Sequence, residues 1–236
     1  MSKEKQDVAS KHFGNEKSAI YDDLIRWSIP GYDAMHDMAR LILKQHATGE
    51  SHVLVVGAGT GMETVALSDS SPEWSIVAVD PSEAMLATAS EKINEKGLAE
   101  RISLKTGYVS DLDSDPIFDA ATSILVMHFI PDNGAKEDYL KEIGKRIKKG
   151  GKMVLVDVGK DIESGYSDSV VETWKNYQKE KRIDPENVDK DFEHITSDVY
   201  PVTEERTMEL LAKTGFGKVE RFYQALVFKG YVATKK

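Results

Sequence analysis

The sequence contains no cysteine in its 236 residues. This absence excludes disulfide bonds, cysteine–zinc sites and a thiolate nucleophile, and it fits a reducing cytoplasm. No segment approaches the ~18 consecutive apolar residues of a membrane span, and the polar stretch that follows Met1 lacks the apolar core of a signal peptide. We therefore expect a cytoplasmic protein without a membrane partner.

Positive charge is the scarcer of the two signs. The chain has 31 lysines and arginines against 40 aspartates and glutamates, which gives a formal net charge of -9. The resulting field repels nucleic acid and anionic membrane surfaces, so it disfavours a nucleic-acid partner. The hydrophobic share of 40% is that of an ordinary globular protein with a sizeable core.

Composition and spacing divide the chain into a tail and one domain. Residues 1–17 are charged and poor in large apolar groups, which predicts a mobile tail, and residues 18–236 form the domain. Within it, residues 18–48 predict a helical cap with a bend near Pro30, because proline disfavours helix in the residue before it. Residues 161–200 are polar and largely helical, which predicts an inserted lid.

The middle of the chain alternates short apolar runs with helical patterns. Nearly all-apolar strands separated by helices are typical of a parallel sheet covered on both faces. We expect an α/β fold, a Rossmann-like doubly wound sheet that is mostly parallel and carries a C-terminal antiparallel hairpin, plus the helical cap. The expected strands are 53–56, 75–80, 102–105, 120–127 and 153–158, helices are expected at 83–96, 139–147 and 203–214, and the hairpin at 219–232.

A glycine-rich turn follows the first strand at Gly57-Ala58-Gly59-Thr60-Gly61, and Asp80 ends the second strand about 20 residues later. Glycines let the backbone of such a turn approach a ligand, and a carboxylate at Asp80 can accept both ribose hydroxyls of an adenosine. A dinucleotide site would have its third glycine at position 62, where this chain has Met62. The spacing therefore favours a nucleoside ligand without pyrophosphate over a nicotinamide dinucleotide.

Longer motifs carry a resemblance to a known family. They are Val-Gly-Ala-Gly-Thr-Gly at 56–61, Val-Asp-Pro-Ser-Glu-Ala-Met-Leu at 79–86, Gly-Tyr-Val at 107–109, Met-His-Phe-Ile-Pro-Asp at 127–132 and Lys-Lys-Gly-Gly-Lys-Met-Val-Leu at 148–155. With these motifs the chain resembles the class I S-adenosylmethionine-dependent methyltransferases. The resemblance implies S-adenosylmethionine as the cofactor and methyl transfer to a small-molecule acceptor, by a monomer or a homodimer.

The same resemblance implies which residues bind the cofactor. Gly57, Ala58 and Gly59 would face its methionine part, Asp80 its ribose, and Ile124 with Leu125 its sulfonium. Tyr21 belongs to the implied set, and the adenine would lie near Pro81, Met85, Tyr108 and Val109. Many relatives have an acid at the position of Val55 and others at the position of Tyr108, so the resemblance implies looser contacts to the ammonium and the adenine in this chain.

Catalysis needs few residues because the sulfonium is already activated, and positioning can supply ~7 to 11 kcal/mol of the barrier. His128 follows the fourth expected strand and is the candidate general base, with a structural or solvent-facing histidine in a loop as the alternative. His194 is a weaker candidate. The aromatic residues of the lid would either roof the pocket or form a small core of their own. The basic run at 145–149 is interpreted as the end of a helix, where cations complement the helix dipole.

Two other functions remain open. Ser28-Ile29-Pro30-Gly31-Tyr32 and the C-terminal Ala-Leu-Val-Phe-Lys-Gly-Tyr-Val-Ala segment resemble the carboxy-S-adenosylmethionine synthase branch, which serves tRNA wobble-uridine modification, and Tyr32 would then contact the methionine end. Those synthases hold the added carboxylate with an arginine, near which this chain has Phe192. This favours plain methyl transfer unless Lys181 or Arg182 reaches the pocket. The other alternative is a module that binds S-adenosylmethionine without catalysis.

Overall fold

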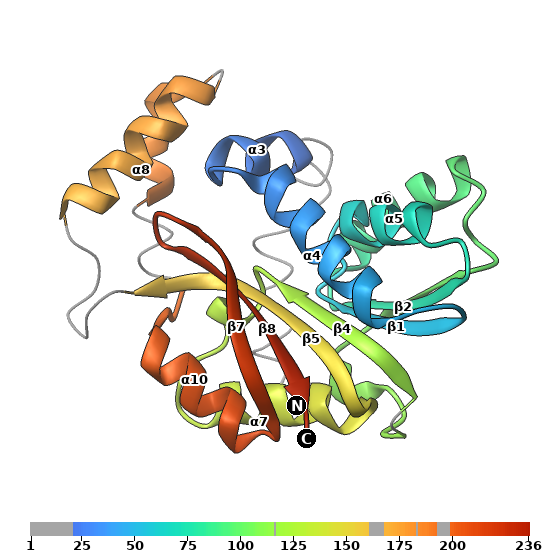
Figure 1. Ribbon diagram of the computed structural model, residues 1–236. Coiled ribbons are helices and arrows are strands. Elements are labelled where there is room, and N and C mark those ends of the chain that lie inside the picture. The colour runs from blue at the N-terminus through green and yellow to red at the C-terminus, as the bar shows by residue number, and fades with distance from the viewer. Residues whose placement is uncertain (1–20, 116, 161–167, 183, 193–198) are drawn as a thin grey trace.

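The computed structural model describes residues 21–115, 117–160, 168–182, 184–192 and 199–236. Its centre is a sheet with the strand order β3-β2-β1-β4-β5-β8-β7, and the short β6 pairs with β5. Strands β1 to β5 run parallel, whereas β8 is antiparallel to both β5 and β7. The expected Rossmann-like sheet with a C-terminal antiparallel hairpin is confirmed (Figure 1).

The elements follow one another in the order that the sequence predicts. The strands are β1 (Ser51–Val56), β2 (Trp74–Asp80), β3 (Ile102–Thr106), β4 (Phe118–Ile124), β5 (Ile147–Lys160), β6 (Val202–Thr203), β7 (Phe216–Ala225) and β8 (Phe228–Lys235). The α-helices are α3 (Tyr21–Ser28), α4 (Tyr32–His46), α5 (Met62–Ser70), α6 (Glu83–Glu95), α7 (Ala135–Arg146), α8 (Asp168–Lys181) and α10 (Glu204–Lys213). Short 3₁₀ turns are η1 (Val109–Asp111), η2 (Met127–Phe129) and η3 (Pro185–Asn187).

Helices cover the sheet on two faces, which gives three layers (Figure 1). Alternate side chains of a strand point to opposite faces, and β1 therefore contributes to two cores. Val53 and Val55 pack with residues of α4, α5 and α6, whereas Leu54 and Val56 pack with residues of α7 and α10. The all-apolar strand that indicated a parallel sheet is thus buried from both sides.

The N-terminal cap has the expected bend. α3 ends at Ser28 and α4 begins at Tyr32, and the intervening Gly31 has a φ of 71°. The left-handed backbone at Gly31 turns the chain between the two helices, which glycine allows at little cost. The predicted mobile tail, residues 1–17, lies outside the described residues.

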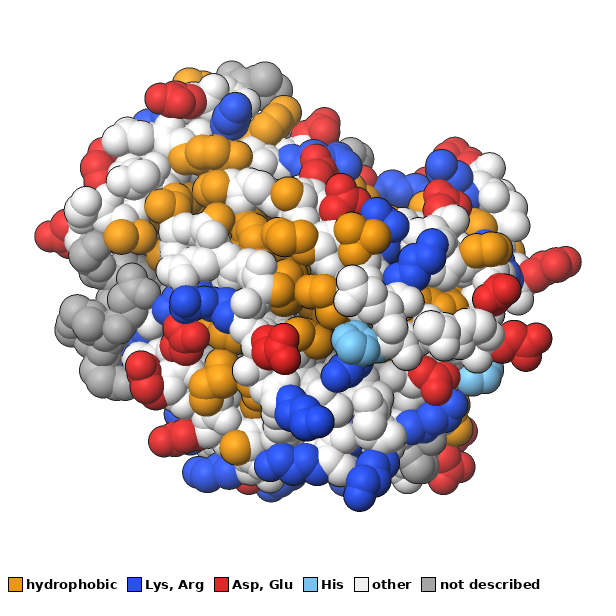
Figure 2. Space-filling view, viewed as in Figure 1, with side chains coloured by type: hydrophobic (Ala, Val, Ile, Leu, Met, Phe, Trp, Pro, Cys, Tyr) orange, Lys and Arg blue, Asp and Glu red, His pale blue; other side chains and the backbone are white. Residues whose placement is uncertain are grey.

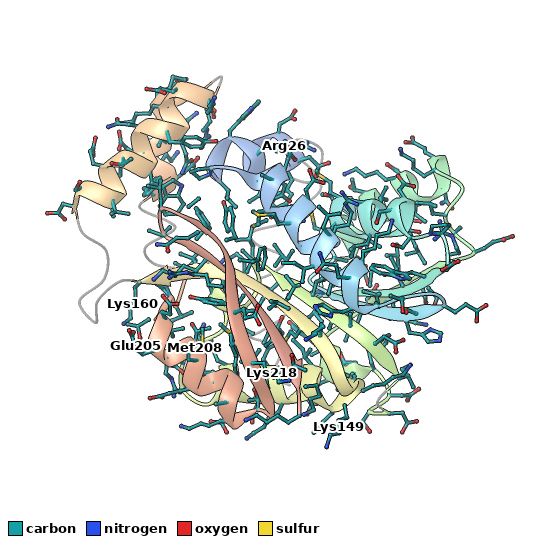
Figure 3. All side chains as sticks on the ribbon, in the orientation of Figure 1. Arg26, Lys149, Lys160, Glu205, Met208 and Lys218 are labelled. Carbon is teal, nitrogen blue, oxygen red and sulfur yellow. The ribbon has the colours of Figure 1, made fainter. Side chains whose placement is uncertain are left out.

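The fourth strand was predicted too long. It ends at Ile124 rather than at Met127, because Leu125 adopts a φ of 60° and the chain then enters η2. A left-handed residue cannot continue the strand pairing. The sequence stays apolar beyond Ile124 because η2 is also buried, and this misled the prediction of the strand end. The fifth strand begins at Ile147, earlier than expected, and Lys149 and Lys160 mark its two ends in Figure 3.

The predicted lid of residues 161–200 is described in part, and its main element is α8. Trp174 is buried against Phe192 and Phe228, with ring centroids 4.6 Å and 5.1 Å away, and its indole N–H donates to the Ser28 carbonyl at 2.7 Å. Trp174 and Phe192 therefore form a small core with Phe228, and this core ties α8 to α3 and to the hairpin. Figure 2 shows hydrophobic side chains at the surface where these elements meet. Tyr166 and His194 lie outside the described residues.

Candidate functional site

The glycine-rich turn joins β1 to α5 at the carboxyl end of β1. Its first two amides extend the parallel pairing, since Gly57 N and Ala58 N donate to the Val79 carbonyl at 2.8 Å and 3.1 Å. Gly57, Gly59 and Gly61 have φ values of 80°, 52° and 80°. Three left-handed residues within five positions require glycine at each of them, as the motif predicts.

The three glycines serve different purposes. A Cβ on Gly57 would lie 2.2 Å from Val126 Cγ2, and one on Gly61 would lie 2.8 Å from the Ala89 Cβ, so both positions are closed by protein atoms. A Cβ on Gly59 would meet nothing within 4 Å. Gly59 is therefore the position where a ligand can approach the backbone, whereas Gly57 and Gly61 allow neighbouring elements to pack.

Asp80 lies directly beside this open position. Its side chain is 9% exposed, Oδ2 accepts from Gly59 N at 2.9 Å, and Oδ1 accepts from Ser82 N at 2.8 Å. Burial raises the pKa of Asp80, and these two backbone amides oppose the rise. A carboxylate has about four lone-pair sites, so two remain for the hydroxyl groups of a ligand. Asp80 is thus held in a fixed orientation at the end of β2.

The N-terminal cap closes over the turn. Asp22 of α3 accepts from Thr60 Oγ1 and forms an ion pair with Lys92 of α6. Burial raises the pKa of Tyr21, and the charges of Asp80 and Asp22 raise it further, which places Tyr21 near the Asp80 carboxylate. Arg26, on α3 in the upper part of Figure 3, pairs with Asp33 of α4 at 3.0 Å. The first two helices are therefore fixed to the elements that form the turn.

The remaining predicted adenine neighbours gather on the β2–β3 side of the turn. Tyr108 is half-buried, and its pKa is raised by burial and then by the charges of Asp111 and Asp80. Val109 is 4% exposed and Met85 2% exposed, while Pro81 follows Asp80 and is half-buried. Met85 is almost fully buried on α6, and its place near the adenine stays a prediction.

A second group of side chains lies at the carboxyl ends of β4 and β5. His128 Nδ1 contacts Asp157 Oδ1, and the two side chains are only 8% and 10% exposed. Ile124 and Leu125 precede this pair, and the Leu125 amide donates to the Val156 carbonyl at 2.8 Å. A carboxylate on Nδ1 fixes the ring orientation and leaves Nε2 as the reactive nitrogen, as in a base held by an orienting acid. The alternative of a solvent-facing His128 is wrong.

Lys136 supports the same loop from beneath. It is fully buried, and its Nζ donates to the Met127 carbonyl at 2.6 Å. Burial lowers the pKa of Lys136, while the charges of Asp157 and Asp132 oppose the shift. A cavity of about 10 Å³ borders Lys136, Asp157 and Tyr231, which is room for about one water molecule. Within the described residues, Asp157 Oδ2 is buried without a hydrogen-bond partner, and Asp157 lines this part of the interior.

Sequence reasoning missed three charged residues of the site: Asp157, Lys136 and Glu63. Asp157 gave a signal, because it is the acid within the apolar run of residues 153–158, but nothing local pairs it with a histidine 29 residues away. Glu63 is in the first turn of α5, where acids are common for helix-dipole reasons, so its burial could not be read from the pattern.

Two kinds of feature are absent from the parts of the chain that the structure describes. No group of three or more histidine, aspartate or glutamate side chains could hold a metal ion. Among those same residues, no helix has both the length and the apolar character needed to cross a lipid bilayer.

Known proteins are similar to this chain in sequence and in fold. Residues 53–151 match the family model described as a methyltransferase domain. In solved structures, the fold is similar to human N-acetylserotonin methyltransferase in complex with SAM, at a TM-score of 0.60 and 16% identity over 86% of this chain and 52% of that chain. Residues 53–151 therefore form a methyltransferase domain, and the chain has the Rossmann-like fold of the solved methyltransferase. The predicted class of enzyme, a methyltransferase, is confirmed.

Two further proteins are similar over most of the chain. One is the carboxy-S-adenosyl-L-methionine synthase of Hahella chejuensis, 24% identical over 97% of this chain and 94% of the relative. The other is a solved structure of Burkholderia thailandensis 1,6-didemethyltoxoflavin-N1-methyltransferase with 1,6-didemethyltoxoflavin and S-adenosylhomocysteine bound, at a TM-score of 0.60 and 20% identity over 86% of this chain and 79% of that chain.

Proposed function

We propose that the protein is an S-adenosylmethionine-dependent methyltransferase that acts on a small-molecule acceptor. The observation that carries this proposal is the Asp80 carboxylate, oriented by Gly59 N and Ser82 N beside the only glycine of the turn whose outer face is open among the described residues. The remaining lone pairs of Asp80 suit the two ribose hydroxyls of an adenosine.

The residues present fit the cofactor. Gly59 gives room for close approach of the ligand, Tyr21 and Tyr108 lie near Asp80, and Ile124 with Leu125 lines the end of β4. The cofactor supplies a methyl group on a positively charged sulfur. The protein binds and orients it, and α3 excludes water through the Asp22 contacts to Thr60 and Lys92.

His128 is the general base of this proposal for an acceptor that must lose a proton. Asp157 holds Nδ1, so Nε2 accepts the proton and Asp157 stabilises the charged ring that results. Because the proposed cofactor is made inside cells, we place the enzyme in the cytoplasm, as a monomer or a homodimer. A native mass spectrum of the purified protein reads the oligomeric state and any retained cofactor together.

The binding proposal is tested with Asp80→Ala and calorimetry. The variant loses both acceptors for the ribose hydroxyls, and charge-assisted hydrogen bonds contribute about 1.5 to 3 kcal/mol each, so affinity for S-adenosylhomocysteine falls by about 100-fold or more. Asp69→Ala, an exposed aspartate at the far end of α5, is the matched control. Equal affinity in the Asp80 variant and the wild type would contradict the proposal.

Carboxy-S-adenosylmethionine synthesis is the second candidate function, favoured by the Hahella chejuensis relative. The lid chemistry weighs against it. Phe192 is buried against Trp174, and Arg182 is paired with Asp184 at 2.9 Å and Asp191 at 2.5 Å, while Lys181 Nζ lies 6.0 Å from the Tyr177 ring. Arg182 is held by two carboxylates of the lid and Lys181 is exposed on α8, so we infer that an added carboxylate would lack a partner. A co-purified ligand with the mass of the carboxylated cofactor would reverse this preference.

A further inference from the structure

Glu63, in the first turn of α5, is half-buried, and its carboxyl oxygen Oε1 is buried and not used by the proposed function. We propose that Glu63 binds the ammonium group at the amino-acid end of the cofactor, in place of the acid that β1 lacks at Val55. This assignment rests on the proposed function and goes further, because it names the group that recognises the methionine part of the ligand.

Glu63 reaches the sheet where the missing acid would lie. Val55 of β1 pairs with Thr122 of β4 in parallel register, so the two side chains point to the same face. The Thr122 hydroxyl lies close enough to the Glu63 carboxyl to affect its titration. A carboxylate from α5 therefore arrives next to the fully buried Val55, two residues before the glycine turn.

The Glu63 carboxyl has the Thr122 hydroxyl beside it and, among the described residues, no cation in an ion pair with it. Within the described residues, Glu63 Oε1 and Thr122 Oγ1 are both buried, and they lie near enough for Thr122 to lower the Glu63 pKa but not in the geometry of a full hydrogen bond. None of the ion pairs found among the described residues involves Glu63. A buried polar group without a full set of hydrogen bonds destabilises the folded protein, and more strongly when it is charged. A ligand that brings a cation and several N–H donors would remove this cost.

The surroundings of Glu63 select a cation. Tyr32 is buried beside it, and the pKa of Tyr32 is raised by burial first and then by the charges of Tyr21 and Glu63. Burial raises the pKa of Glu63 to about 7, against the lowering effect of Thr122. An ammonium group placed here would restore the ionised form of Glu63, because an opposite charge at short range favours the charged state.

The order of the strands puts Glu63 and Asp80 on opposite sides of the glycine turn. β1 lies between β2, which carries Asp80, and β4, which carries Thr122. A ligand that lies across Gly59 with its ribose at Asp80 therefore extends toward Glu63 with its other end. In S-adenosylmethionine that end carries the α-amino group, which makes an ammonium the partner of Glu63.

The test compares two ligands that differ in one group. S-Adenosylhomocysteine carries the amine, and its deaminated analogue keeps the nucleoside, sulfur and carboxylate. In calorimetry, Glu63→Gln should lose about 10- to 100-fold in affinity for S-adenosylhomocysteine and little for the deaminated analogue, because a charge-assisted hydrogen bond is removed from one complex only. Glu83→Gln, an exposed glutamate in the first turn of α6, is the matched control and should bind both ligands as the wild type does.

The outcomes separate the two levels of the proposal. Wild-type protein that binds neither ligand would refute the proposed function, and the Glu63 assignment with it. Wild-type binding with an equal loss of both ligands in Glu63→Gln would refute the assignment alone and make Glu63 structural. Loss confined to S-adenosylhomocysteine supports it.

A measurement on the wild type does not depend on the variant. Its preference for S-adenosylhomocysteine over the deaminated analogue should rise from about pH 6 to about pH 7.5 as Glu63 ionises, while the ligand amine stays protonated. The ionisable neighbours do not account for such a rise, since His36 has its pKa lowered to about 4, both tyrosines have raised pKa values, and Asp22 is paired with Lys92. A preference that does not change with pH would overturn the assignment.

Discussion

The two ends of the site are built differently. At the β1–β2 end, the geometry is set mainly by backbone groups. Three left-handed glycines shape the turn, and two backbone amides orient Asp80. At the β4–β5 end, the geometry is set by side chains. His128, Asp157 and Lys136 are buried, and their contacts hold the loop after β4 in place. Backbone geometry suits the constant part of a ligand, whereas buried titratable groups suit chemistry that depends on the acceptor.

The largest expected effect is on turnover and comes from substitutions at the β4–β5 end of the site. His128→Ala should lower turnover by about 10² to 10⁴-fold with an acceptor that loses a proton, because general-base catalysis contributes that much. Asp157→Asn keeps the size of the orienting group and should cause a smaller loss with a shifted pH–rate profile. The measurement is single-turnover methyl transfer from labelled cofactor to an acceptor found in a panel of hydroxyl and amine compounds.

Cofactor affinity distinguishes catalysis from binding in the same variants. Both should bind S-adenosylhomocysteine as the wild type does, since neither residue contacts the glycine turn. Full turnover in His128→Ala would remove the histidine from the reaction and make the His128–Asp157 pair a structural contact.

The next largest effect is on stability and comes from substitutions in the glycine turn at the β1–β2 end. Gly57→Ala places a Cβ 2.2 Å from Val126 Cγ2 at a φ of 80°. Left-handed strain costs roughly 1 to 2 kcal/mol and overpacking about 1 to 3 kcal/mol, so the free energy of unfolding should fall by about 2 to 5 kcal/mol in urea denaturation. Gly59→Ala has open space around its Cβ and should lose only the strain, while its ligand affinity falls.

Adding Val126→Ala to Gly57→Ala removes the atom that causes the clash. The double variant should recover the overpacking part of the lost stability and keep the conformational part. If Gly57→Ala and Gly59→Ala were equally stable, the packing role assigned to Gly57 would be wrong.

The smallest expected effect is a pH dependence of the free energy of unfolding. It comes from Glu63, which lies between the two ends of the site. Its carboxyl has a pKa of about 7 in the folded protein against 4.5 as the ordinary value. The folded state therefore binds more protons than the unfolded state between these values, and the free energy of unfolding falls as pH rises through this interval. Glu63→Gln should remove that fall and be more stable than the wild type near pH 8 by roughly 1 to 3 kcal/mol.

Melting curves of both proteins from about pH 5 to about pH 8 test this expectation. The difference between the curves isolates Glu63, because Asp80, whose pKa burial also raises, is present in both. Curves that stay parallel across the whole range would show that Glu63 titrates normally in the folded protein.

The sequence predicted the backbone end of the site better than the side-chain end. Glycines followed at a fixed distance by an acid form a local pattern, and its requirement for left-handed residues can be read directly. The contact of His128 with Asp157 depends on how β4 and β5 align, which no local spacing encodes. The burial of Glu63 depends on the packing of α5 against α4 and β4, and the end of β4 on the backbone at Leu125.

Val126 joins the two ends. Its methyl group fills the space beside Gly57, and it lies two residues before His128 in the chain. A ligand that displaces the turn by even a few tenths of an ångström must push on this methyl group, because a close-packed contact transmits displacement rather than absorbing it. The imidazole thus acts as a reporter of occupancy, and its NMR resonances should register the arrival of a nucleoside that never touches the ring.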